Sequence, residues 1–106
     1  MILVALGSNC NGPWGTPRDA VAEALRRFEA DEPCGPEANM AKMLAADASF
    51  EAANVAIQTH GGFGFAEDFD IERKFRETRL YQVAPISTNL ILSHLAEHVL
   101  GLPRSY

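Results

Sequence analysis

The chain has 106 residues, 47% of them hydrophobic and 22% charged, and its formal net charge is -5. This composition is typical of a soluble globular domain with a modest core and argues against a disordered segment. The negative charge gives no general electrostatic attraction for a polyanion, so we expect no nucleic-acid partner.

The longest aliphatic run, MILVAL at residues 1–6, is too short to cross a bilayer and follows no positively charged segment. We therefore expect a cytoplasmic protein with no membrane partner. Cys10 and Cys34 lack the CxxC spacing. In that compartment they are expected to be reduced thiols rather than a disulfide or a zinc site.

The first elements in chain order are a strand and a helix. Branched aliphatic residues at 1–6, ended by Gly7, predict a buried strand. Thr16 as N-cap and Pro17 at the first helical position predict a helix over residues 17–29. Its apolar stripe comprises Val21, Leu25 and Phe28.

A second helix is expected after the proline-containing break at residues 31–36. The alanine-rich segment 37–59 predicts a helix that begins near Pro36 and is ended by Gly61 and Gly62. Its buried face, with positions three and four apart, carries Met43, Ala46, Phe50, Ala53 and Ile57.

Two further helices complete the predicted order. The third covers residues 69–82, with Ile71 and Phe75 facing inward. Its surface is expected to form two ion pairs one helical turn apart, Asp70 with Lys74 and Glu72 with Arg76. The fourth begins at Pro85 and ends before Gly101. Its apolar stripe comprises Leu92, Leu95, Ala96 and Val99.

One strand and four helices give a mainly α fold class. The strand is expected to pair between chains or to belong to a different fold, because the chain offers no second strand for its backbone donors and acceptors.

Two short motifs could hold a metal. His94 and His98 flank Glu97 in the HxxEH pattern of inverted zinc peptidases, but too few residues follow to supply a third protein ligand. Two solvent-facing histidines on an amphipathic helix are the favoured interpretation. Asp68 and Asp70 form a DxD pattern, which an acidic helix N-terminus explains better than a magnesium site, because no phosphate-binding loop accompanies it.

The segment QTHGGFGF at residues 58–65 has two interpretations. Gly61 and Gly62 can end a helix, because glycine adopts positive φ at no steric cost. They can also leave backbone N–H groups accessible to a pyrophosphate, and three glycines in four residues exceed what a helix end requires. The residues alone leave both interpretations open.

From about Asp31 to Tyr106 the sequence resembles the C-terminal helical domain of acyl-CoA dehydrogenases, the flavoenzymes that desaturate acyl-CoA thioesters. The resemblance rests on Gln58–Phe65, on ERKFRETR at residues 72–79, and on Tyr81-Gln82-Val83 followed by the turn Ser87-Thr88-Asn89. It implies a partial four-helix bundle, preceded here by the N-terminal strand and helix.

The resemblance also implies a cofactor, a substrate and a homo-oligomer. In that family the Q-x-x-G-G segment contacts the ADP part of FAD held by a neighbouring subunit, and a Thr-Ser-Glu turn touches the flavin. Acyl-CoA would be the substrate. The residues implied in FAD binding here are Gln58, Thr59, His60, Gly61, Gly62, Ser87, Thr88 and Asn89.

No catalytic residue is expected. Where most members of the family place the glutamate that takes the α-proton, this chain has Pro85, which has no proton-accepting group. The family's upstream helical and β domains, which form most of the flavin and acyl pockets, have no counterpart here. We therefore expect no turnover by this chain alone.

Residues 1–29 resemble the start of a different family, 6-hydroxymethyl-7,8-dihydropterin pyrophosphokinase of the folate pathway, through MILVALGSN and WGTPRDAVAEALRRF. A chimera is then expected, with one domain at residues 1–30 and another at 31–106. The primary hypothesis is a fragment of an acyl-CoA dehydrogenase flavoprotein. The alternatives are a fragment of the pterin enzyme, which would bind ATP and a pterin, and a non-enzymatic helical module that self-associates.

Overall fold

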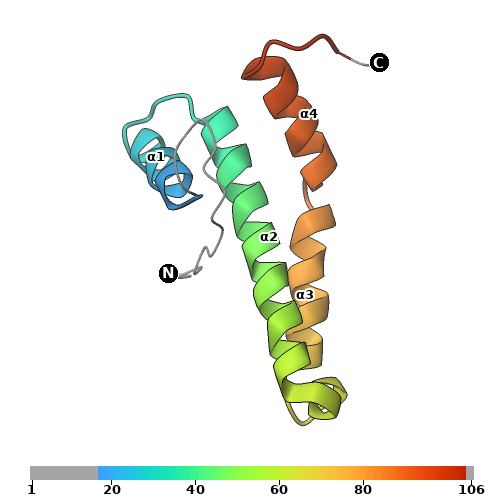
Figure 1. Ribbon diagram of the computed structural model, residues 1–106. Helices are drawn as coiled ribbons and strands as arrows, with labels where there is room; N and C mark the ends of the chain where they lie inside the picture. Colours follow the sequence, from blue (N-terminus) through green and yellow to red (C-terminus); the bar gives the residue numbers. More distant parts are fainter. Residues whose placement is uncertain (1–16, 105–106) are drawn as a thin grey trace.

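The computed structural model describes residues 17–104, which form four α-helices and one 3-10 helix (Figure 1). The α-helices are α1 (Pro17–Glu29), α2 (Gly35–His60), α3 (Ile71–Val83) and α4 (Thr88–His98), and the 3-10 helix η1 (Gly61–Phe65) follows α2 directly. These described residues contain no strand, which confirms the mainly α fold. The strand expected at residues 1–6 and the cap expected at Thr16 lie outside them.

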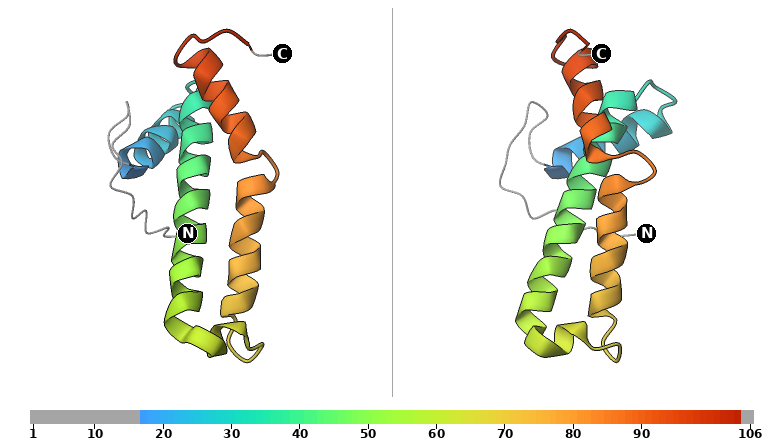
Figure 2. Two further views of the ribbon diagram at one scale, coloured as in Figure 1. Left: turned by 45° about the vertical axis from the view of Figure 1, so that its right-hand side comes forward. Right: turned by 90° about the vertical axis from the view of Figure 1, so that its right-hand side faces the viewer.

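The long helix α2 is the centre of the structure. The chain reverses through η1, so that α3 runs antiparallel beside the C-terminal half of α2 (Figure 1). After a break, α4 continues beyond α3 and packs beside the N-terminal half of α2, as both views of Figure 2 show. The first helix, α1, packs against α2. Because α1, α3 and α4 all contact α2, this helix sets the relative positions of the others.

The helix boundaries follow local sequence signals. The bounds expected for α1 are confirmed, and α2 begins one residue before Pro36 and ends at His60, where Gly61 adopts φ +57°. The Gly61 N–H donates to the carbonyls of Gln58 and Ile57, which closes the C-terminus of α2. The expected start of α4 at Pro85 is wrong. Ser87 is the N-cap instead, because its hydroxyl accepts a hydrogen bond from Leu90 N–H at 3.3 Å.

The core is small and consists mostly of alanine at the helix contacts. The buried hydrophobic side chains of the described residues are Ala20, Ala46, Ala53 and Ile91. The expected inner face of α2 is confirmed by Ala46 and Ala53. Small side chains let the helix axes approach closely, so little apolar area is buried for each contact.

Three residues expected to line apolar stripes are exposed instead. Leu25 and Phe28 of α1 are 56% and 75% exposed, and Leu92 of α4 is 53% exposed. Ala20 makes the buried contact of α1, and Ile91 that of α4. Periodicity identifies an apolar helix face, but only the packing of the other elements decides which part of that face is covered.

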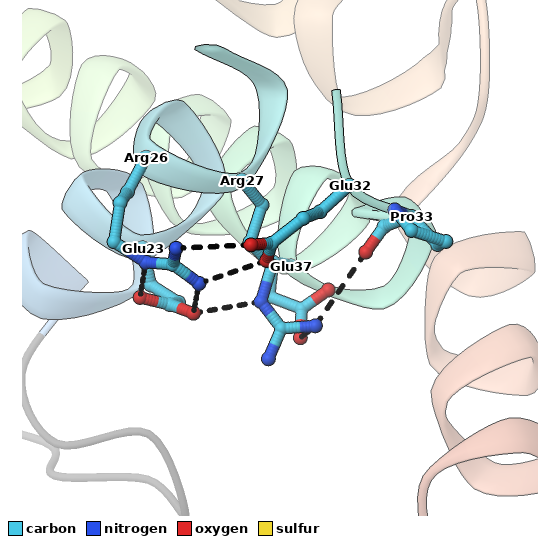
Figure 3. A network of polar contacts seen from close by, with 6 residues as sticks. All are labelled: Glu23, Arg26, Arg27, Glu32, Pro33 and Glu37. Carbon is cyan, nitrogen blue, oxygen red and sulfur yellow. Dashed lines mark hydrogen bonds and ion pairs between the residues drawn. The ribbon is translucent and has the colours of Figure 1, made fainter. Parts of the chain in front are cut away.

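An ionic network joins α1 to the start of α2 (Figure 3). Glu23 accepts hydrogen bonds from Arg26 and Arg27, and these lower the pKa of Glu23 to about 2. Arg26 also forms an ion pair with Glu32 at 3.1 Å, and Arg27 also forms an ion pair with Glu37 at 3.1 Å. Glu37 is only 4% exposed, and its Oε2 has no hydrogen-bond partner in the described part of the chain. Arg27 is therefore the cation that compensates a buried carboxylate.

The outer face of α3 carries alternating charges, as expected. The predicted pair of Glu72 with Arg76 is confirmed at 2.9 Å. The predicted pair of Asp70 with Lys74 is wrong, because Arg73 pairs with Asp70 and Lys74 pairs with Glu77. Hydrogen bonds from Lys74 and Arg73 lower the pKa of the Glu77 carboxyl. Such solvated pairs stabilise a helix only slightly.

Among the described residues, no helix is long and apolar enough to cross a membrane. Cys34 is a free cysteine, as expected, and Cys10 lies outside the described residues.

Candidate functional site

The segment predicted to contact FAD lies at the end of the α2–α3 hairpin, where α2 passes into η1 (Figure 1). Gln58, Thr59 and His60 form the last turn of α2, and Gly61 and Gly62 open η1. All five residues are exposed. The segment is therefore accessible to a ligand or to another chain.

The three glycines of the segment differ in what the fold requires of them. Gly61 has φ +57°, a conformation that side-chain-bearing residues rarely adopt. Gly64 is buried, and a Cβ there would lie 3.0 Å from the carbonyl oxygen and 3.2 Å from the Cα of Ile57. Gly62 has neither requirement, since its φ is ordinary and a Cβ would meet no described atom within 4 Å beyond the adjoining backbone. The fold thus explains two glycines and leaves Gly62 without a structural reason.

Thr59 and His60 direct polar atoms back onto α2. The Thr59 hydroxyl donates to Val55 O at 2.8 Å, and His60 Nδ1 lies 2.9 Å from Ala56 O. Because a carbonyl oxygen only accepts, Nδ1 carries the hydrogen in this contact, which leaves Nε2 available to another group. The Gly61 N–H is also used within the helix end. The exposed Gln58 amide is therefore the group of this segment best able to donate to a ligand.

The second predicted group, Ser87-Thr88-Asn89, forms the start of α4. Ser87 O accepts from Ile91 N–H at 3.1 Å, and the Ser87 hydroxyl caps the helix through Leu90 N–H. The Asn89 side chain is exposed in the first turn. The positive end of the α4 dipole therefore lies at this turn.

The structure does not bring the two predicted groups together. One lies before α3 and the other after it, and the 13 residues of α3 span about 20 Å at the rise of an α-helix. Pro85 lies in the connection from α3 to α4, beside the second group. It is exposed and provides no acidic or basic atom at the place where the sequence resemblance put a catalytic base.

Lys42 of α2 links this helix to the end of α3 and to the connection before α4, although no sequence motif marks it. Its Nζ donates to the backbone carbonyl of Tyr81 near the end of α3 and to that of Ile86 at 2.6 Å, just before α4. Gln82 adds a second link from α3 to α2, because its Nε2 donates to Asp47 Oδ1 at 2.8 Å. These partners are at least 35 residues apart in sequence, so no local pattern indicates them.

Among the described residues, no further ligand completes either of the two candidate metal motifs. Within residues 17–104, no group of three or more histidine, cysteine, aspartate or glutamate side chains could hold a metal ion. The rings of His94 and His98 lie 4.4 Å apart between centroids. The expectation that both face solvent is wrong for His94, whose Nε2 is buried and has no hydrogen-bond partner among the described residues. Asp70 is the N-cap residue of α3, in agreement with an acidic helix start.

Residues 14–100 match the family model of the acyl-CoA dehydrogenase C-terminal domain. The match begins before α1 and so includes most of the segment that resembled a pterin pyrophosphokinase, and no comparison supports that second resemblance. The expected domain boundary at residues 30 and 31 stays a prediction.

Curated relatives agree with this match. The chain is 44% identical over 69 residues to the acyl-CoA dehydrogenase FadE12 of Mycobacterium tuberculosis, covering 65% of this chain and 18% of that protein. It is 35% identical over 68 residues to an acyl-CoA dehydrogenase of Bacillus subtilis, covering 64% and 18%. It is 36% identical over 63 residues to the 3-(aryl)acrylate reductase of Clostridium sporogenes, covering 59% and 17%.

The chain thus spans about 18% of the length of the first two relatives and 17% of the third. The family match, in contrast, extends over most of this chain, from before α1 to just beyond α4. The chain therefore belongs to the acyl-CoA dehydrogenase family, through the C-terminal domain of that family.

Proposed function

We propose that this chain is the FAD-contacting C-terminal helical part of an acyl-CoA dehydrogenase-family flavoprotein. In this proposal residues 58–62 contact the ADP part of FAD, and residues 87–89 contact the flavin. The observation that carries the proposal is Gly62, because it is exposed and neither its φ nor its packing requires glycine. A ligand that approaches the backbone closely is a reason for glycine at such a position.

The groups present fit a dinucleotide. The Gln58 amide is an exposed donor and acceptor, and apart from the adjoining backbone no described atom lies within 4 Å of the Cβ position of Gly61 or Gly62. At the other end of α3, the start of α4 offers the exposed Asn89 amide and the positive end of a helix dipole. The separation of about 20 Å along α3 supports contact with two different portions of the extended cofactor.

We propose that the chain does not turn over acyl-CoA alone. When bound, FAD would supply the hydride acceptor for desaturation of the acyl chain. Proton abstraction would still need a base, and Pro85 supplies none in the connection between α3 and α4. Acyl-CoA as substrate, a homo-oligomeric state and a cytoplasmic location are part of the same proposal.

The test is a titration of the purified chain with FAD, followed by flavin fluorescence. We expect saturable binding that weakens in Gln58→Ala and Gly62→Ala. Gly35→Ala is the matched control, because Gly35 is equally open but lies at the other end of α2. Absence of binding by the unmodified chain would refute the proposal. Equal weakening by Gly35→Ala would refute the assignment of the site.

A second candidate function, self-association, is favoured by the exposed apolar surface. Fourteen large hydrophobic side chains of the described residues are exposed. They are Leu25, Phe28, Val55, Phe63, Phe65, Phe69, Leu80, Tyr81, Val83, Ile86, Leu90, Leu92, Leu100 and Leu102. Exposed apolar side chains that form a contiguous patch often mark a protein–protein interface.

In this second candidate, copies of the chain cover one another's apolar helix faces. Sedimentation velocity over a range of protein concentrations is the test, and a mass that grows with concentration is expected. Leu80→Glu should shift the equilibrium towards monomer, because Leu80 is exposed and its replacement leaves the monomer's core intact. A monomer at every concentration would rule this candidate out.

A further inference from the structure

Near the end of α3, the backbone carbonyl of Tyr81 has no N–H partner within its own helix. In an α-helix each carbonyl accepts from the N–H four residues later. Leu80 O does so, since it accepts from Ala84 N–H at 2.8 Å. The corresponding partner of Tyr81 O would be residue 85, which is proline and has no N–H. Tyr81 O therefore needs a donor from outside its own helix.

A second carbonyl without a helical partner lies just after Pro85. The N–H that would bond to Ile86 O in a continuing helix belongs to Leu90, and it donates instead to the Ser87 hydroxyl at 3.3 Å. Ile86 O thus lies immediately outside α4. The connection between α3 and α4 presents two carbonyls, one on each side of Pro85, that local backbone donors do not serve.

Lys42 serves both. Its ammonium donates to Tyr81 O and to Ile86 O, the latter at 2.6 Å. In the part of the chain that the structure describes, no carboxylate forms an ion pair with Lys42. The positive charge lies at the C-terminal end of α3, where the helix dipole favours a cation. Hydrogen bonds from a charged donor are stronger than those between neutral groups.

We propose that Lys42 is the positioning residue for the Ser87-Thr88-Asn89 turn. By holding the carbonyls on both sides of Pro85 to one atom of α2, it fixes where α4 starts relative to the α2–α3 pair. The turn directly follows Ile86, so its place is set by this clamp. The consequence for flavin contact rests on the proposed function, whereas the clamp itself is a property of the free chain.

Amide hydrogen exchange of the free full-length chain tests the clamp. In Lys42→Met, which keeps the aliphatic stem and removes the donors, exchange at Leu90 and Ile91 should accelerate at least about tenfold. Lys42→Arg keeps a charged donor and should restore most of the protection. Lys74→Met removes the chain's other lysine, which pairs with Glu77 on α3, and should leave these two amides unchanged.

Protection within α1 and the middle of α2 shows that the variants are folded. If Leu90 and Ile91 exchange at the same rate in Lys42→Met as in the unmodified chain, the clamp is refuted. If Lys42→Met loses protection throughout the chain, Lys42 has a general structural role and the specific positioning role is also refuted.

The FAD titration separates this inference from the proposed function. If the unmodified chain binds FAD, Lys42→Met should weaken binding by about the same factor as it destabilises the start of α4, and Lys42→Arg should not. Unchanged FAD binding by Lys42→Met would refute the positioning role towards the flavin. If the unmodified chain binds no FAD, the proposed function fails, and the exchange data still decide the clamp.

Discussion

Phe50 of α2 and Phe75 of α3 pack with their ring centroids 5.1 Å apart and their planes inclined by 41°. The guanidinium carbon of Arg79 lies 5.3 Å from the centroid of the Phe50 ring. Both phenylalanines were expected on inner helix faces, and both are half-buried. Because the other core contacts of α2 are made largely by alanine, this aromatic pair is a principal apolar contact between the two helices.

Phe75→Ala should therefore destabilise the chain by about 3 kcal/mol, the lower end of the range for removing a phenylalanine from a core. Urea denaturation followed by circular dichroism measures this change. Phe28→Ala is the control and should change the free energy of unfolding by less than about 0.5 kcal/mol, because Phe28 is largely exposed. In a double-mutant cycle, Phe50 and Phe75 should show a coupling of about 1 kcal/mol. Additive effects would contradict direct ring contact.

The glycines of the α2–η1 junction should differ in their tolerance of alanine. Gly64→Ala places a Cβ against the backbone of Ile57 and should cost about 1–3 kcal/mol. Gly62→Ala adds a methyl group to open space and should leave stability within about 0.5 kcal/mol. Thermal denaturation of the two variants measures whether Gly64→Ala is less stable than Gly62→Ala. A large loss of stability in Gly62→Ala would show that the fold itself requires this glycine.

Helix order was predictable because its signals are local. The proline at the start of α1, the three-and-four spacing of α2 and the glycine after His60 act within one or two turns. The start of α4 was misplaced because proline is also common at helix starts. At Pro85 the decisive feature was the Ser87 hydroxyl, which reaches Leu90 N–H.

The arrangement of the site was less predictable for a physical reason. Periodicity gave an apolar face to α1 but could not show that Leu25 and Phe28 lie outside the contact with α2. Lys42 donates to backbone carbonyls 39 and 44 residues away. Every residue has a backbone carbonyl, so the residue types in the sequence do not indicate which carbonyls Lys42 contacts. The missing N–H of Pro85 was the one available indication that a donor from elsewhere was needed.

Arg27 should contribute more to stability than its neighbour Arg26. Arg27 pairs with Glu37, which is almost fully buried, whereas the partners of Arg26 are more exposed. Removing Arg27 takes away the cation that pairs with a buried carboxylate, whose Oε2 already has no hydrogen-bond partner within residues 17–104. Arg27→Met should therefore lower Tm by at least about 5 °C more than Arg26→Met does.

The double variant Arg27→Met with Glu37→Leu is the matched test of that explanation. It removes both charges and should recover much of the lost Tm, because an apolar pair carries no desolvation penalty. Equal losses from Arg26→Met and Arg27→Met would show that the burial of Glu37 does not govern the effect.

Glu23 should make the chain sensitive to acid. Hydrogen bonds from Arg26 and then Arg27 lower the pKa of Glu23 from 4.5 to about 2 in the folded chain. A group whose pKa is lower in the folded state stabilises that state above the unfolded pKa, and the contribution is lost as pH falls towards the folded pKa. The contribution of Glu23 should therefore be complete above about pH 4.5 and disappear between that pH and about 2.

Urea denaturation at pH 6 and at pH 2.5 measures this loss. Glu23→Gln should be less stable than the unmodified chain at pH 6, and the difference should shrink at pH 2.5 because the carboxylate is then becoming protonated. Glu51→Gln, an exposed change on α2 outside the ionic network, should show no such convergence. At 1 M salt the difference at pH 6 should also shrink, because the screening length falls to about 3 Å. A difference that persists at low pH would mean that Glu23 acts through packing rather than through its charge.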